Sequence, residues 1–286
     1  MHWRLPITLI MLASTTMVSD VMAKQDDESL WFIPGSFIVG DRDLRSSRRS
    51  IGGGLDIDDV DWPEIININY VDLELGQRTI GLVELTTESK RPLILYCGGS
   101  AFRSTLSGGT FGLHLLLYGD VVLMDYPGYG RSSGSARKRF FVPAARKALA
   151  YARHKADKED RRLVLWGMSL GGVVCPFAAD AAEQVDLVVL ETPTIRAASV
   201  KDPDKTPHVQ IEALKEKTSR ALVLAATQRD EPVSAFEALA DGLRNVGIDT
   251  EVLVFDTAHG DVLFHESSYD RLSPYFATLV RDPEKQ

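Results

Sequence analysis

The chain has 286 residues, of which 44% are hydrophobic and 25% charged, and its formal net charge is −8. This balance is ordinary for a soluble globular protein with a sizeable core, and the length suits one large α/β domain or two small ones. The acidic charge argues against nucleic acid as a main partner, because phosphate binding needs a basic surface. Two short basic clusters, at residues 45–49 and 137–139, do not change this expectation, since the first is followed by an acidic run at residues 56–61.

The first 23 residues have the pattern of a secretory signal peptide. A basic start at Arg4 precedes an apolar run at residues 5–13 that is short for a membrane span, and V-M-A at residues 21–23 suits cleavage after Ala23. We therefore expect a secreted or periplasmic protein with no stable membrane span after cleavage. An uncleaved N-terminal anchor is the alternative interpretation.

Residues 24–63 predict an irregular N-terminal lead-in, and residues 64–286 a single domain in which strands and helices alternate. Short runs rich in Val, Ile and Leu, separated by helical stretches, predict a mostly parallel sheet covered by helices on both faces. The predicted strands cover residues 65–75, 79–86, 93–96, 121–124, 163–166, 187–190, 221–225 and 251–255. The predicted helices end near 118, cover 143–154 and 233–246, and follow Ser169 and His259. Residues 192–219 predict a small cap over the active-site face.

The chain has two cysteines, Cys97 and Cys175, and both fall in segments that should be buried. Cys97 ends a predicted strand, and Cys175 lies in the helix after Ser169. Two buried free thiols are the favoured interpretation, while an exported protein would also allow one disulfide.

The most informative segment is an apolar strand at residues 163–166 that runs into G-M-S-L-G at residues 167–171 and then into a helix. This is the sequence pattern of a nucleophile elbow, in which a sharp turn raises the serine hydroxyl above the sheet. Gly167 and Gly171 leave room for the turn. The helix start favours negative charge developing beside it. Ser169 is therefore the predicted catalytic nucleophile.

A serine nucleophile needs a general base, and the base needs an orienting acid. Working groups in such sheets follow the carboxyl ends of strands. His259, after the strand at residues 251–255, is the predicted base, and Asp230, after the strand at 221–225, the predicted acid. Glu191 also ends a strand and is the competing acid, although a structural or rim position is favoured for it. The other candidates are Glu231, as a charge at a helix start, and histidines that follow no strand: His114, His154, His208 and His265. His114 is expected at a core position, and His265 one or two turns into the last helix.

An oxyanion hole would complete the site, formed by N–H groups that point at the charge created when the serine attacks a carbonyl. The backbone amide of Leu170, directly after the nucleophile, would supply one donor. The loop C-G-G-S at residues 97–100 would supply the second, through Gly99 or else Ser100, because glycine lets the backbone approach a substrate closely.

The chain resembles the α/β-hydrolase superfamily over residues 64–280. The resemblance rests on the elbow, on D-Y-P-G-Y-G-R-S-S-G at residues 125–134, on D-E-P-V at 230–233 and on A-H-G at 258–260. It implies an eight-stranded, mostly parallel sheet and a hydrolase acting through Ser169, Asp230 and His259, in the chain order of that superfamily. The similarity is greatest to esterase-like and depalmitoylase-like members with a small cap. Those members usually carry His-Gly where this chain has Cys97 and Gly98.

The sequence thus predicts a serine hydrolase that cleaves a carboxylic ester or thioester of a small molecule through an acyl-enzyme. No metal or cofactor is expected, because no Cys/His cluster has the spacing of metal ligands. An acyltransferase or peptidase using the same triad is an alternative. The competing class is a non-catalytic binding protein that retains the fold, because fold does not fix function. The sequence leaves the substrate and the oligomeric state open.

Overall fold

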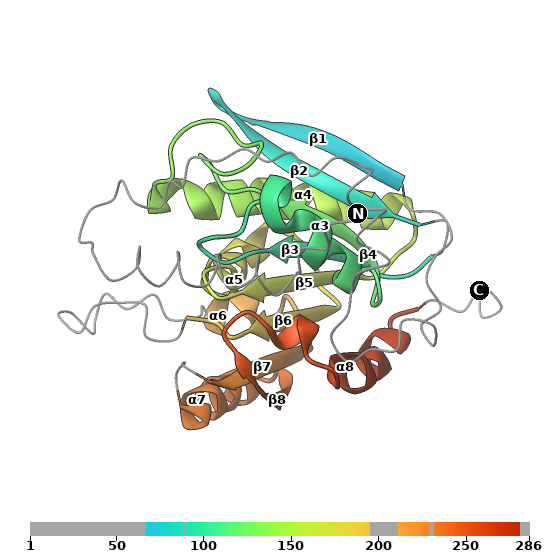
Figure 1. The fold of residues 1–286 in the computed structure, drawn as a ribbon, viewed down its shortest axis with the longest axis vertical. Coiled ribbons are helices and arrows are strands. Elements are labelled where there is room, and N and C mark those ends of the chain that lie inside the picture. Colours follow the sequence, from blue (N-terminus) through green and yellow to red (C-terminus); the bar gives the residue numbers. More distant parts are fainter. Residues whose placement is uncertain (1–66, 88–89, 195–210, 229–231, 281–286) are drawn as a thin grey trace, which may run out of the picture. The chain divides into compact units, whose positions relative to one another are not determined.

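The structure is a computed structural model that describes residues 67–87, 90–194, 211–228 and 232–280 (Figure 1). All of these residues belong to one compact unit. The predicted signal peptide, the lead-in at residues 24–63 and residues 195–210 of the predicted cap lie outside the described residues.

The centre of this unit is an eight-stranded sheet with the strand order β1-β2-β4-β3-β5-β6-β7-β8. Only β2 runs against the others: it pairs antiparallel with β1 and β4, and the remaining neighbours pair in parallel. The strands are β1 (Asn67–Leu75), β2 (Arg78–Thr86), β3 (Leu93–Cys97), β4 (Asp120–Met124), β5 (Leu163–Met168), β6 (Leu187–Glu191), β7 (Arg220–Gln228) and β8 (Asp249–Ala258).

Helices cover both faces of the sheet, as the continuous apolar strands require. The α-helices are α3 (Ser104–Leu115), α4 (Phe141–Lys158), α5 (Gly171–Ala178), α6 (Ile211–Leu214), α7 (Val233–Asn245) and α8 (Ser268–Ala277). Short 3-10 helices are η3 (Lys138–Phe140), η4 (Ala179–Ala181) and η6 (Val262–Phe264). In Figure 1, α3 and α8 lie in front of the sheet and α4 behind it.

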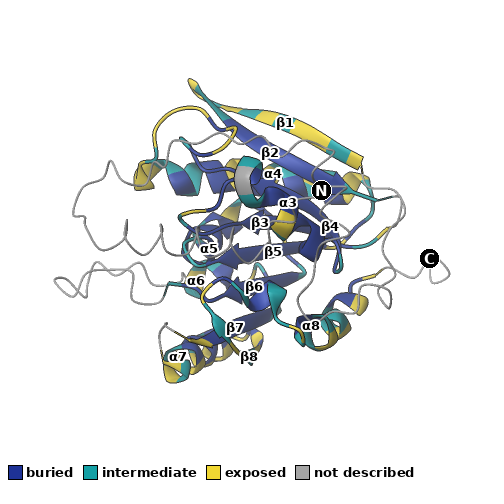
Figure 2. Cartoon of the chain, in the orientation of Figure 1, coloured by how far each residue is buried: buried dark blue, intermediate teal, exposed yellow. Residues whose placement is uncertain are grey.

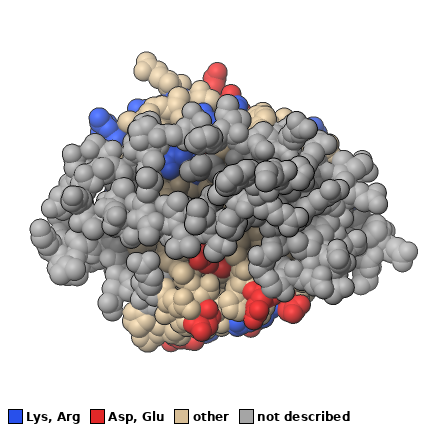
Figure 3. Space-filling view, viewed as in Figure 1, with Lys and Arg blue, Asp and Glu red and all other residues tan. Residues whose placement is uncertain are grey.

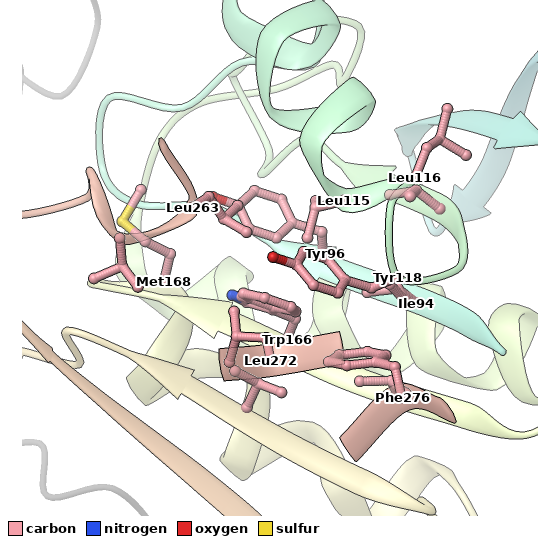
Figure 4. Packing of buried hydrophobic residues seen from close by; sticks show 14 of the residues in the cluster. Ile94, Tyr96, Leu115, Leu116, Tyr118, Trp166, Met168, Leu263, Leu272 and Phe276 are labelled. Carbon is pink, nitrogen blue, oxygen red and sulfur yellow. The ribbon is translucent and has the colours of Figure 1, made fainter. Parts of the chain in front are cut away.

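Alternate residues of each strand serve the two faces, as the period of two dictates. On the face covered by α3 and α8, Tyr96 and Trp166 pack with Leu272 and Phe276 of α8 in one buried cluster (Figure 4). The central strands β3, β4, β5 and β6 are buried along their whole length, whereas β1 at the sheet edge alternates between exposed and half-buried residues (Figure 2).

All eight predicted strands are confirmed, with differences at their ends. β7 and β8 extend to Gln228 and Ala258, beyond their predicted ends, because the two strands continue to pair through an irregularity between Ala226 and Gln228. The described part of the predicted cap includes the four-residue helix α6. Within the described residues, no helix has both the length and the hydropathy needed to cross a bilayer.

A buried ion pair lies at the end of the sheet where β3 and β4 start, opposite the carboxyl ends of these strands. Arg161 Nη2 lies 3.0 Å from Asp120 Oδ2, and the two side chains are 5% and 0% exposed. Arg161 also donates to the carbonyl oxygens of Arg91 and Pro92, which immediately precede β3. These contacts tie the starts of β3 and β4 to the turn after α4, so they contribute to the fold rather than to the predicted site.

Candidate active site

Ser169 lies at a sharp turn between β5 and α5 and has a positive φ of 53°. A residue with a side chain pays about 1–3 kcal/mol for this conformation, which therefore persists only where the surroundings enforce it. Glycine is needed on either side: a Cβ on Gly167 would lie 2.8 Å from the nitrogen of Gly172, and one on Gly171 would lie 3.0 Å from the carbonyl oxygen of Gly98. The turn thus has the geometry that the sequence pattern predicts for an elbow.

Backbone hydrogen bonds hold the serine from the neighbouring strand. The Ser169 amide donates to the carbonyl oxygen of Glu191 at 2.9 Å, and the Thr194 amide donates to the carbonyl oxygen of Ser169 at 3.3 Å. The hydroxyl oxygens of Ser169 and Thr194 are also 3.3 Å apart. Sequence reasoning missed Thr194, because no local pattern places the residue after Pro193 beside the elbow.

Three loops meet around the side chain of Met168, the residue before the serine. A Cβ on Gly99, in the loop after β3, would lie 3.1 Å from Met168 Cε and 3.3 Å from Ser169 Cβ. A Cβ on Gly260, in the loop after β8, would lie 3.7 Å from Met168 Cε. The carboxyl ends of β3, β5 and β8 therefore converge on the elbow, as expected for an α/β sheet.

His259 directly follows β8, at the turn that continues into Gly260 with φ +79°. It is exposed, and it interacts electrostatically with the buried Glu191 and with Asp261. The structure thus brings His259 to the same end of the sheet as Ser169. Asp230, the predicted acid, and Glu231 lie outside the described residues.

Glu191, the competing acid, is fully buried at the end of β6 and does not lie at a rim. Its Oε2 accepts a hydrogen bond of 2.8 Å from the indole nitrogen of Trp166. Burial raises the pKa of Glu191 to about 7, opposed by the Trp166 hydrogen bond and by His259. Figure 4 shows the Trp166 nitrogen pointing toward the end of the sheet where Met168 lies. A buried carboxyl that titrates near neutrality beside a histidine is a feature of functional sites.

The predicted oxyanion donors lie on either side of the serine. Leu170 precedes the first residue of α5, so its amide belongs to the start of a helix, where developing negative charge is favoured. Gly99 lies against Ser169, and its carbonyl oxygen accepts from the Phe102 amide at 3.1 Å, which closes the loop into a turn. Gly99 and Leu170 thus both neighbour the nucleophile, one by packing and the other in the chain.

The expectation of two free thiols is wrong, because Cys97 and Cys175 form a disulfide. Their Cα atoms are 6.6 Å apart, although 78 positions separate them in the chain. The pairing of β3 with β5 brings this about: Cys97 lies opposite Gly167, and the helix after the elbow folds back over the end of β3. Sequence reasoning could not establish that β3 and β5 are neighbours.

The loop at residues 125–134, which is part of the family resemblance, is held together by hydrogen bonds around Asp125. The Asp125 carboxylate accepts from the Ser104 amide at 2.7 Å and from the Arg131 amide at 2.9 Å, while Ser132 Oγ donates to the Asp125 carbonyl. Gly130, with φ +42°, has no room for a Cβ beside that carboxylate. The loop therefore positions the start of α3, which directly follows the Gly99 turn.

The remaining histidines in described positions have other surroundings. His114 is buried and its Nδ1 lies 2.9 Å from the Thr110 carbonyl oxygen, so the expected core position is confirmed. His265 lies between η6 and α8, where its Nδ1 accepts from the Ser267 amide, rather than inside the last helix. Among the described residues, no group of three or more His, Cys, Asp or Glu could hold a metal ion.

Several solved esterases have a similar architecture. An esterase from Pyrococcus furiosus aligns over 80% of this chain and 96% of its own, with a TM-score of 0.63 and 12% identity. A thermostable esterase from Pseudomonas putida aligns over 84% and 88%, with a TM-score of 0.62 and 14% identity. One from Pyrobaculum calidifontis aligns over 83% and 88%, with a TM-score of 0.60 and 16% identity. The chain therefore has the α/β-hydrolase fold, and the predicted fold class is confirmed.

Sequence comparison gives shorter matches. The uncharacterized protein YfhR of Salmonella typhimurium is 40% identical over 53 residues, which span 18% of each chain. YfhR of Escherichia coli O157:H7 is 29% identical over 75 residues, 26% of each chain. These matches thus span about a fifth to a quarter of the curated relatives. No family model matches the chain.

Proposed function

We propose that this protein is a serine hydrolase that cleaves a carboxylic ester or thioester of a small molecule, with Ser169 as nucleophile, His259 as general base and Asp230 as orienting acid. The observation that carries the proposal is the positive φ of Ser169 at the end of β5. Strain of this kind on a residue with a side chain is characteristic of functional sites. The convergence of the Gly99 and His259 loops on the same point adds the other parts of an acyl-transfer site.

The proposed reaction has two balanced steps. Ser169 Oγ attacks the acyl carbon while the His259 imidazole takes its proton, and the tetrahedral oxyanion is stabilised by the amides of Leu170 and Gly99. The alcohol or thiol then leaves with that proton, and the acyl group stays on Ser169. In the second step, water gives a proton to His259 and its oxygen to the acyl carbon, which releases the acid and restores the serine.

A fluorophosphonate probe tests the nucleophile directly. We expect wild-type protein to be labelled at Ser169 and to hydrolyse short p-nitrophenyl esters, and Ser169→Ala to do neither. Thr194→Val is the matched control. It removes a hydroxyl oxygen 3.3 Å from Ser169 Oγ but leaves the nucleophile in place, so the variant should still be labelled. Wild-type protein that is not labelled, or a Ser169→Ala variant labelled to the same extent, would favour a non-catalytic binding protein.

The acid is tested by a separate comparison of Asp230→Asn with Glu191→Gln. If Asp230 orients the imidazole, Asp230→Asn loses most of kcat, because the base then lacks its partner. A loss of kcat confined to Glu191→Gln would assign the orienting acid to Glu191. Hydrolysis profiles across p-nitrophenyl esters of increasing chain length would then define the acyl pocket.

We further propose that the protein is exported and cleaved after Ala23. The basic start, the short apolar run and the small residues before the cleavage position support this proposal. Mass spectrometry of the protein from the extracellular or periplasmic fraction should find Lys24 at the mature N-terminus. An intact N-terminus in a membrane pellet would instead indicate an uncleaved anchor.

A further inference from the structure

The disulfide connects the two segments that supply the proposed oxyanion donors. Cys97 is the last residue of β3 and is followed by Gly98 and Gly99, while Cys175 lies in α5, the helix that starts directly after Leu170. Both cysteines are buried, with 0% and 1% of their surface exposed. The cross-link is therefore part of the interior beneath the site.

The same two segments are also in direct backbone contact. A Cβ on Gly171 would overlap the carbonyl group of Cys97 and would lie 3.0 Å from the carbonyl oxygen of Gly98. The start of α5 thus packs on the backbone of the loop after β3 with no side chain in between. A shift of that loop relative to α5 would therefore change the distance between the amides of Gly99 and Leu170.

Hydrogen bonds of the sheet do not extend into this loop. The paired residues of β3 and β5 end with Cys97 opposite Gly167, so the ladder stops immediately before Gly98. Beyond this point, the loop is held by its turn, by the hydrogen bond of 3.3 Å that the Tyr126 hydroxyl donates to the Gly98 carbonyl, and by packing against Met168 and Gly171. The covalent bond from Cys97 to α5 adds to these contacts. The disulfide restrains the loop at the last residue that the sheet still holds.

We propose that the Cys97–Cys175 disulfide positions the oxyanion hole, so that hydrolysis by Ser169 depends on the oxidised state of this pair. The proposal rests on the function proposed above. Oxyanion donors act only when they are held at the place where charge develops, because reorganisation during the reaction reduces their effect. Cys97 and Cys175 are positioning residues in this scheme and do not touch the substrate.

Reduction of the bond is a two-electron reaction. A dithiol such as dithiothreitol breaks the S–S bond, gives two cysteine thiols and is itself oxidised to a cyclic disulfide. In a reducing compartment the protein would therefore hold two thiols and a less restrained loop. After export, exchange with an oxidised disulfide compound, which takes up the two electrons and two protons and leaves as thiols, would form the bond and complete the site, so activity would appear where the protein is delivered.

The test compares wild type, wild type treated with dithiothreitol, and Cys97→Ala/Cys175→Ala. Leu243→Ala, at a buried position in α7 away from the site, serves as the control for a general loss of stability. Each protein is assayed for kcat and KM with p-nitrophenyl butyrate and for its rate of fluorophosphonate labelling. Circular dichroism at the assay temperature identifies proteins that have unfolded. Alkylation counts the thiols of the treated wild type, so that a sample with two thiols answers the question if the double variant does not fold.

We expect the reduced protein and the double variant to lose about 10-fold to 100-fold in kcat with KM within about twofold, somewhat less than deletion of one oxyanion donor. Leu243→Ala should keep its kcat below its unfolding temperature. The proposal is overturned if the folded double variant keeps wild-type kcat, if Leu243→Ala loses kcat equally, or if active wild type carries two alkylatable thiols. Wild type that neither hydrolyses nor is labelled would overturn the proposed function and this inference with it.

Discussion

Replacing Glu191 by Gln should raise the free energy of unfolding at neutral pH. The substitution should also remove most of the pH dependence that Glu191 gives to this free energy. Glu191 is fully buried and accepts a hydrogen bond from Trp166, which the amide oxygen of Gln can also accept. Its charge also interacts with the Leu263 backbone amide and with titratable side chains, which are His259, Asp261, Tyr96 and Tyr118. Because Gln keeps the shape and the Trp166 contact, the substitution mainly deletes the ability to ionise.

The magnitude follows from the pKa. Burial raises the pKa of Glu191 from the ordinary 4.5 to about 7. Each pKa unit corresponds to about 1.4 kcal/mol, so the difference amounts to about 3 kcal/mol. Below pH 4.5 the carboxyl is neutral in the folded and unfolded states. Between pH 4.5 and 7 only the unfolded state ionises, so this contribution to the free energy of unfolding is progressively lost as pH rises, and above pH 7 the loss is complete.

Urea denaturation of wild type and Glu191→Gln at pH values from 4 to 8 measures this effect. The variant should gain about 3 kcal/mol relative to wild type across that range, because groups that do not interact with Glu191 titrate alike in both proteins and cancel. Glu237→Gln, which changes an exposed carboxyl of α7, should track wild type. A stability difference between Glu191→Gln and wild type that stays constant with pH would refute the reasoning.

Two further predictions concern the loop after β3 and the buried ion pair at the start of β4. Gly99→Ala adds a methyl group 3.3 Å from Ser169 Cβ. It should slow fluorophosphonate labelling on the order of 10-fold, because small displacements of reacting groups lower the rate. Labelling at the wild-type rate would contradict the placement of this loop. Arg161→Met leaves Asp120 buried without its cation and should lower the free energy of unfolding by about 3–5 kcal/mol in urea. The neighbouring Arg162→Met removes the 44% exposed ion-pair partner of Asp186 and should lower the free energy of unfolding by at most about 1 kcal/mol. Equal losses in the Arg161 and Arg162 variants would show that burial does not determine the contribution of these ion pairs.

The described part of the face in Figure 3 carries both acidic and basic side chains, with acidic ones gathered toward the sheet edge where β7 and β8 lie. The proposal of a small ester or acyl substrate rests on the site around Ser169 and not on this distribution of charge.

The residue pattern was sufficient to predict the eight strands, the parallel architecture and the turn at Ser169. These features depend on local chemistry: uninterrupted Val and Leu runs bury both faces of a strand, and glycine at positions 167 and 171 permits the sharp turn. The sequence also predicted the position of His259, because groups at the carboxyl ends of parallel strands lie at the same end of the sheet.

Only the tertiary structure decided what lies beneath these groups. The bond between Cys97 and Cys175 depends on β3 lying beside β5, and the contact of Glu191 with Trp166 depends on β6 lying on the other side of β5. Strand order is set by the packing of distant segments, which no local pattern encodes. The sequence by itself therefore determined which residues follow the carboxyl ends of the strands, and the fold determined which of them are buried, cross-linked or electrostatically coupled.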